Sequence, residues 1–163
     1  MSYEKLLHNK IKEISGNDLR VYLFTHEEFI EKLPTVKSGA LLTKNNSKEY
    51  TGFAIAIDGS ESDDMKLRIL FHEIGHLKFE KSIGYLEVQE RKGLDESAWN
   101  IETEFYAFEN ELLESYQLAA NGDKEFLINT IKKMEENYDN DYKDALKKIK
   151  HTELWDNCQK ILA

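Results

Sequence analysis

Residues 71–77 constrain this chain more than any other stretch, because they place His-Glu-Ile-Gly-His at positions 72–76. Residues four apart lie on one side of an α-helix, so His72 and His76 can direct their imidazole nitrogens at a single ion. Glu73 lies about 100° around the helix from His72, where its carboxylate can reach a water on that ion. Two imidazoles with an adjacent carboxylate base are typical of a zinc-dependent hydrolase.

The residues around this motif predict that it lies in a helix. Ser62 is suited to cap the first turn, and the two aspartates that follow it complement the helix dipole. An apolar stripe with helical spacing follows, formed by Leu67, Leu70, Phe71, Ile74 and Leu77. His72, His76 and Ile69 fall on a different side, which predicts a buried face and a separate metal face. Gly75 costs about 1 kcal/mol relative to alanine inside a helix, which predicts that another element approaches closely there. Two surface histidines on an ordinary amphipathic helix are the alternative interpretation.

The chain before the motif alternates between helical and strand patterns, which favours an α+β fold. We expect a helix ended by Gly16, a second short helix capped by Thr25 with Glu28 and ended before Pro34, and a turn at Asn45 and Asn46. The expected strands cover residues 20–24, 39–44 and 50–57. These short strands precede the long helices, so a small sheet is predicted to pack against one face of the motif helix.

The chain after the motif is predicted to be helical. The motif helix should run to about residue 81, and an exposed loop should follow at 84–95. A long helix is expected from Asp95 to about Ala120, closed by Asn121 and Gly122. Two or three further helices are expected in 123–163, with a break near 138–141. The prediction is one domain of residues 1–163 with a helical C-terminal extension from about 123.

Composition limits the class of partner. The 163 residues carry a formal net charge of −9, which argues against a direct phosphate-binding surface for nucleic acid. No stretch is long and apolar enough to predict a membrane span or a secretion signal. Cys158 is the single cysteine, so an intrachain disulfide is impossible, and we expect it to be a buried apolar residue of the last helix. A cytoplasmic location is the simplest interpretation.

A zinc site needs a third protein ligand, and residues 101–113 of the helix expected at 95–120 offer four glutamates. Its apolar side is formed by Ala98, Ile101, Phe105, Phe108 and Leu112. Glu102 and Glu109 project beside this stripe, whereas Glu104 and Glu111 point away from its centre. If the stripe faces the motif helix, Glu102 is the better ligand and Glu104 is the next candidate.

The motif and this second helix together resemble the ImmA/IrrE family of gluzincin-like zinc metallopeptidases. That family carries the sequence E-x-E-A-N/D-x-F-A with two leucines soon after, and residues 102–109 followed by Leu112 and Leu113 are similar to it. The resemblance covers about residues 21–113 and implies a zincin-like fold with Glu102 as the third ligand. Tyr106 stands where the family has Asn or Asp, an acid or amide that commonly holds a zinc-bound histidine in place. The resemblance also implies a protein substrate, such as a DNA-binding repressor of a mobile element.

These features predict a zinc metallopeptidase in which His72, His76 and Glu102 hold one Zn²⁺ and Glu73 is the general base. The alternative is a catalytically inactive metal-binding module of the same fold that binds its partner without cleaving it. Four further residues are candidates for stabilising the oxyanion, namely His26, Tyr50, Tyr85 and His151. The strand at 50–57 is a candidate for pairing with an extended substrate.

Overall fold

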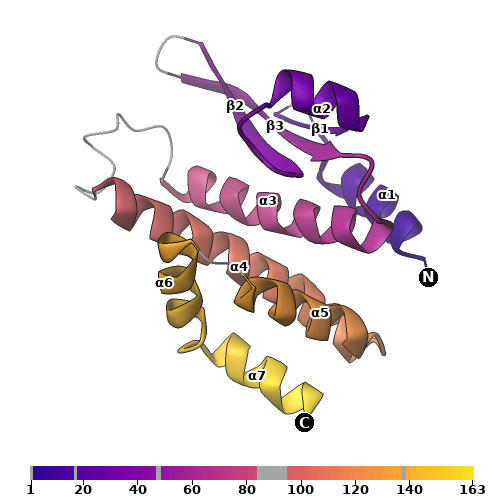
Figure 1. Cartoon of the computed structure of the whole chain (residues 1–163), viewed down its shortest axis with the longest axis vertical. Coiled ribbons are helices and arrows are strands. Elements are labelled where there is room, and N and C mark those ends of the chain that lie inside the picture. The colour runs from indigo at the N-terminus through magenta and orange to yellow at the C-terminus, as the bar shows by residue number, and fades with distance from the viewer. Residues whose placement is uncertain (1, 17, 47–48, 84–94, 137–138) are drawn as a thin grey trace. The chain divides into compact units, whose positions relative to one another are not determined.

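The structure, a computed structural model, belongs to the α+β class and describes residues 2–16, 18–46, 49–83, 95–136 and 139–163 (Figure 1). The elements in chain order are α1 (Tyr3–Ile14), β1 (Leu19–Phe24), α2 (His26–Lys32), β2 (Gly39–Asn46), β3 (Glu49–Asp58), α3 (Asp63–Ile83), α4 (Glu96–Ala120), α5 (Lys124–Glu135), α6 (Asn140–Ile149) and α7 (Glu153–Leu162). The chain divides into two compact units, Met1–Glu73 and Ile74–Ala163. Their boundary falls inside α3, whereas the sequence predicts a helical extension that begins near residue 123. The prediction of one domain stays a prediction.

The first unit contains a three-stranded mixed sheet in the order β1-β3-β2. β3 lies in the centre, parallel to β1 and antiparallel to β2. Leu23, Ile57 and Gly39 lie side by side across the three strands, so their side-chain positions share one face. The strand order contradicts the prediction of substrate pairing for residues 53–57, because that part of β3 is hydrogen-bonded to β1 on one edge and to β2 on the other.

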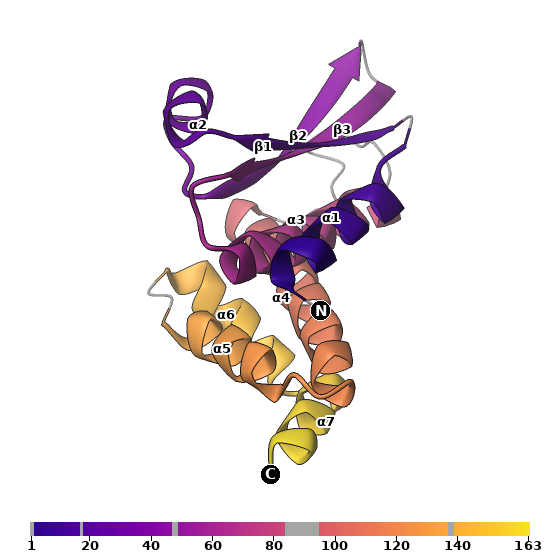
Figure 2. The same cartoon turned by 90° about the vertical axis from the view of Figure 1, so that its right-hand side faces the viewer.

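The two faces of the sheet differ in their cover. Leu19, Ile55 and Ile57 are buried on the face shared with Gly39, and Figure 2 shows α1 and the first part of α3 on that side, opposite α2. Gly39 lies against α3 so closely that a Cβ atom there would lie 2.3 Å from Cγ2 of Ile69. Within this unit, the first residue of β2 therefore lies directly against α3.

The local signals before the motif helix are largely confirmed. Thr25 and Glu28 form both hydrogen bonds of a capping box, and α2 ends at Lys32, before the single proline. The predicted turn at Asn45 and Asn46 is wrong, because both residues belong to β2 and pair with β3 after a register shift that follows Lys44. The strand therefore continues through two residues that are individually common in turns. The loop expected at 84–95 lies almost wholly outside the described residues.

The second unit is organised around α4, which packs against α5, α6 and α7. Its core consists of buried side chains contributed by all four helices: Phe108, Leu112, Ala119, Leu127, Met134, Ala145, Ile149 and Cys158. α4 ends as predicted, since Asn121 is its C-cap and Gly122 adopts a positive φ of 107° that favours glycine. The two or three helices expected after residue 123 are confirmed as α5, α6 and α7.

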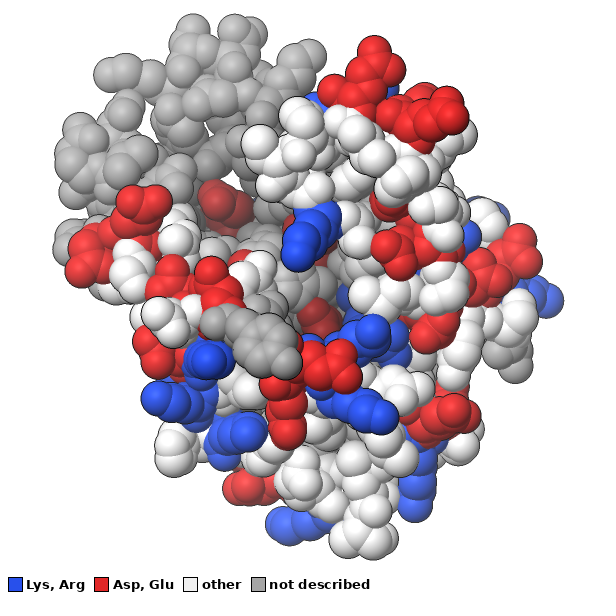
Figure 3. Space-filling view, in the orientation of Figure 1, with Lys and Arg blue, Asp and Glu red and all other residues white. Residues whose placement is uncertain are grey.

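Charged side chains of both signs lie on the face of the molecule drawn in Figure 3. Lys and Arg side chains are mixed with Asp and Glu on the face drawn in Figure 3, so no extended basic area stands apart among the described residues there. Within the described ranges, every helix is too short or too polar to cross a membrane.

Candidate metal centre

One turn of α3 brings together the three residues of the motif. His72, Glu73 and His76 each offer a ligand atom, and these atoms all lie within 4.8 Å of one another. Glu73 is 7% exposed and the two histidines are half-buried, so the group is only partly open to water. Because imidazole nitrogens and a carboxylate suit a divalent transition metal, this group could hold a metal ion, as the sequence predicts.

The predicted apolar stripe of α3 is buried, but the expected division into a buried face and a metal face is incomplete. All five residues of the stripe are buried: Leu67, Leu70, Phe71, Ile74 and Leu77. Ile69, which the sequence places on the metal side, is 8% exposed and lies beside Gly39. A Cβ atom on Gly39 would also lie 3.7 Å from Oε1 of Glu73. The beginning of β2 therefore covers the side of α3 that carries the carboxylate.

Gly75 is the point at which α3 touches α4. A Cβ atom at this position would lie 2.4 Å from Cα of Ala107, 2.5 Å from the carbonyl oxygen of Tyr106 and 2.9 Å from the amide nitrogen of Ala107. Side chains of L-residues do not make contacts this short with backbone atoms. The prediction that a glycine inside the motif marks a close approach is confirmed.

This close approach places two polar residues of α4 against His76. Ala107 touches Gly75, and Thr103 and Glu104 stand one helical turn before Ala107 on the same side of α4. Nδ1 of His76 lies 2.8 Å from Oγ1 of Thr103, and Nε2 lies 3.2 Å from Oε1 of Glu104. The His76 and Glu104 side chains are 15% and 11% exposed. Both ring nitrogens of one motif histidine therefore have a partner on α4.

The orientation of α4 differs from the one inferred from its apolar stripe. Glu104 and Glu111 are buried, at 8% and 6% exposure, whereas Glu102 pairs with Lys148 of α6 at the surface. The inference that the stripe faces the motif helix is wrong. Phe108 and Leu112 of the stripe pack instead into the core of α4–α7, and α4 meets the end of α3 with its opposite, small and polar side. The structure thus places Glu104 at His76 and Glu102 at Lys148.

The second carboxylate oxygen of Glu104, Oε2, is also buried, as is typical of a residue that binds a metal in the interior. No hydrogen bond to this oxygen is found within the residues that the structure describes. The three residues whose ligand atoms lie within 4.8 Å of one another are His72, Glu73 and His76. Glu104 is not one of them, but it contacts His76. The ring of Tyr106 packs against that of Phe79, with the two ring centroids 5.1 Å apart.

Of the four candidates for an oxyanion donor, the structure describes the side chains of two, and neither of these is a neighbour of the motif. His26 contacts Asp58, 2.7 Å away, and lines a separate pocket, whereas His151 is exposed at the end of α6. Tyr85 lies outside the described residues, and the side chain of Tyr50 is likewise not described. The residue that would stabilise the oxyanion therefore stays a prediction.

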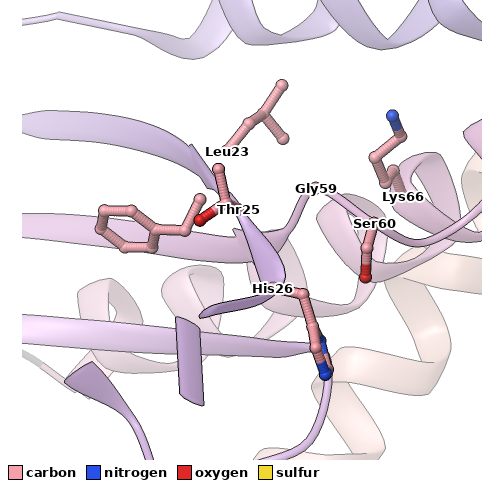
Figure 4. A pocket seen from close by; sticks show the side chains of 7 residues that line it. Leu23, Thr25, His26, Gly59, Ser60 and Lys66 are labelled. Carbon is pink, nitrogen blue, oxygen red and sulfur yellow. The ribbon is translucent and has the colours of Figure 1, made fainter. Parts of the chain in front are cut away.

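The pocket beside His26 has a volume of about 430 Å³ and lies at the carboxyl ends of β1 and β3 (Figure 4). Asp58 contacts two residues that line the pocket: it accepts hydrogen bonds from the backbone N–H and the hydroxyl of Ser60, and its Oδ2 lies 2.7 Å from Nδ1 of His26. Burial alone would raise the pKa of Asp58, but these hydrogen bonds and the charge of His26 outweigh it and hold the pKa below its usual value. Figure 4 shows the amine of Lys66 and the ring of His26 pointing in opposite directions, so these two side chains do not converge on one ligand.

Thr103 is the site residue that sequence reasoning missed. A second helical stripe on α4 carries the signal, with small or polar residues at positions 103, 104, 107, 110 and 111. This stripe contains Ala107, the small residue that a glycine on a neighbouring helix can approach. Matching Gly75 to Ala107 would have predicted the contact, and with it Thr103 and Glu104 as neighbours of the motif.

Comparison with known proteins adds no relative. No protein-family model, no curated protein and no solved structure matches this chain.

Proposed function

We propose that this chain is a zinc-dependent metallopeptidase with a zincin-like arrangement of its motif helix and sheet. The observation that supports it most is the contact of His76 with Glu104, which adds a carboxylate from α4 to the histidine pair of α3. Two imidazoles and one carboxylate form a donor set that fits zinc and leaves a position for water or substrate. In this proposal His72, His76 and Glu104 are the ligands, and Glu104 replaces the Glu102 of the sequence prediction.

The roles of the residues follow from their placement. Zinc, when bound, would polarise the scissile carbonyl and lower the pKa of a water. Glu73 would accept a proton from the attacking water and deliver it to the leaving amine nitrogen. Its burial beside Gly39 limits its access to bulk water and holds it next to β2. Glu73 follows His72 in the chain and lies about 100° around the helix from it. In this proposal its carboxylate acts on a water and is not a metal ligand.

The sheet suggests how a substrate would bind. β2 lies at the edge of the sheet, and its first residue, Gly39, lies beside Glu73. An extended peptide that pairs with β2 would pass the catalytic carboxylate with its backbone held by hydrogen bonds. We propose a protein substrate, such as a DNA-binding repressor, which would place the enzyme in the cytoplasm. The net charge of −9 favours an effect on transcription through this protein partner over direct contact with DNA.

The matched pair Glu104→Gln and Glu102→Gln tests the ligand set, because both changes remove one negative charge from α4. Zinc content after dialysis and the dissociation constant from chelator competition are the measurements. Glu104→Gln should lose most of the bound zinc, since two histidines alone chelate poorly, and Glu102→Gln should retain it. The reverse result would restore Glu102 as the ligand. A wild-type chain that retains no zinc, manganese or iron would refute the metal site.

Glu73→Gln tests the catalytic role. This change keeps the shape of the side chain and all three ligands, so zinc content should not change, while hydrolysis of a cleaved partner should fall by a factor on the order of a hundred or more. If wild-type protein binds its partner and leaves it intact with every metal tried, the chain is the inactive binding module.

A further inference from the structure

We propose that Thr103 is the positioning residue that holds the His76 ring in the orientation needed for metal binding, an inference that rests on the function proposed above. Thr103 lies on α4 next to Glu104 and contacts Nδ1 of His76 through Oγ1 at 2.8 Å. Glu104 contacts the other ring nitrogen at 3.2 Å. Together with the covalent attachment at Cβ, contacts at both ring nitrogens determine the position and the tilt of the ring plane.

The surroundings of this contact limit competition from water and hold the hydroxyl in place. The His76 side chain is 15% exposed and Thr103 is half-buried, so water competes only weakly for Nδ1. Close packing of Gly75 against Ala107 keeps the α4 backbone in place one turn away from Thr103. The hydroxyl is therefore presented by a rigid helix and does not depend on a loop.

A hydroxyl suits this position because it can both donate and accept a hydrogen bond. When Nε2 offers its lone pair to a metal ion, the ring proton is on Nδ1 and is donated to Oγ1 of Thr103. When Nε2 carries the proton and donates it to Glu104, the hydroxyl of Thr103 donates to Nδ1. Thr103 thus keeps the ring in one orientation with either tautomer, whereas a carboxylate at the same place would favour the Nδ1–H form alone.

This role is the one that the family resemblance gives to an Asn or Asp at the position of Tyr106. The Tyr106 ring packs against Phe79, and Thr103, three residues earlier, makes the polar contact with the histidine. The hydrogen-bond partner of the ligand is therefore supplied from a different position of the same helix.

Thr103→Val is the sharpest test, because valine keeps the shape of threonine and removes only the hydroxyl. Loss of a hydrogen bond that orients a metal-ligating histidine should weaken zinc binding by about 10–100-fold in chelator competition. Thr103→Ser retains a hydroxyl and should recover most of the affinity. A Thr103→Val protein that binds zinc as tightly as wild type would overturn the inference.

A matched control separates positioning from general stability. Thr130→Val removes the hydroxyl of a second helical threonine, which contacts Ser115 at 2.9 Å. It should lower the free energy of unfolding without weakening zinc binding. Equal losses of zinc affinity in the two valine variants would show a structural effect only, and would also overturn the inference.

The ring nitrogens of His76 give a readout that needs no metal. In nitrogen-15 spectra of the metal-free wild type, Nδ1 of His76 should show the shift of a hydrogen-bonded nitrogen, and Thr103→Val should change that shift while Thr103→Ser keeps it. An unchanged spectrum in Thr103→Val overturns the inference whether or not zinc binds. If the wild type shows the expected Nδ1 shift but retains no zinc, the proposed function fails and the contact itself is upheld.

Discussion

Replacing Gly75 by alanine is the most informative single perturbation of this chain. The added methyl would lie 2.4 Å from Cα of Ala107 and 2.5 Å from the carbonyl oxygen of Tyr106. Carbon atoms in contact are about 3.5–4.0 Å apart, so the backbones of α3 and α4 would have to separate by about 1 Å or more. The atoms in the way belong to the main chain and cannot rotate aside.

The expected cost has two terms of opposite sign. Overpacking of a tight contact costs about 1–3 kcal/mol, and an overlap with backbone atoms belongs at the upper end of this range. Alanine in place of a helical glycine gains about 1 kcal/mol of helix propensity. We therefore expect Gly75→Ala to lower the free energy of unfolding by about 2 kcal/mol, measured by urea denaturation at neutral pH.

The same separation should damage the site more than the fold. His76 is 2.8 Å from Thr103 and 3.2 Å from Glu104, and a shift of about 1 Å exceeds the roughly 0.2 Å over which metal–ligand distances vary. If the proposed site holds zinc, its affinity should fall by at least about tenfold, since the proposed ligand Glu104 and the hydroxyl of Thr103 both move away from His76.

Gly16→Ala is the matched control, because it makes the same chemical change where no described residue other than the chain neighbours has an atom within 4 Å of the new methyl. It should leave zinc affinity unchanged. If Gly75→Ala protein is as stable as wild type and binds zinc equally well, the packing of α3 on α4 does not set the geometry of His76, and the reasoning is refuted.

Three further predictions concern the first unit and the lone cysteine. Asp58 has a pKa below its usual value in the folded chain, so the stability it contributes is present above about pH 4 and is lost as the pH falls through the folded pKa. Asp58→Asn should reduce this loss of stability in urea titrations between pH 7 and 3. An unchanged dependence of stability on pH would contradict the prediction. Gly39→Ala should destabilise by about 1–2 kcal/mol through overlap with the Ile69 methyl, and Ile69→Ala should relieve part of that overlap in a double-mutant cycle; independent, additive effects would rule the contact out. Cys158 is fully buried and its pKa is raised to about 11 by burial, so a thiol reagent at pH 8 should modify it only as fast as the chain unfolds; rapid labelling of native protein would disprove this.

Local patterns were enough to predict most elements. The capping box of α2, the apolar stripe of α3 and the end of α4 at Asn121 and Gly122 depend on neighbours within a few residues, so the sequence carries their full signal. The turn at Asn45 and Asn46 failed for the opposite reason. Pairing with β3 overrides the turn preference of the two asparagines, and that pairing is a tertiary effect.

The motif residues were predictable and their partners on α4 were less so. His72, Glu73 and His76 share one helix, so spacing alone brings them together. The contact with Glu104 depends on which side of α4 faces α3. The apolar stripe predicts the wrong side, because α4 buries two sides and its apolar side packs against α5, α6 and α7. A helix that packs on both sides cannot be oriented from its hydrophobic residues only.

The register shift in β2 has a consequence for self-association. A strand edge that is open to a peptide is also open to the same edge of another copy, and long regular edges favour such sheet-to-sheet contacts. Regular pairing of β2 runs from Gly39 to Lys44 and shifts before Asn45, and an irregularity of this kind bends a strand and interrupts its ladder. The usable edge is therefore about six residues long. That length would accommodate a short extended segment of a partner while offering a poor template for indefinite stacking of identical chains.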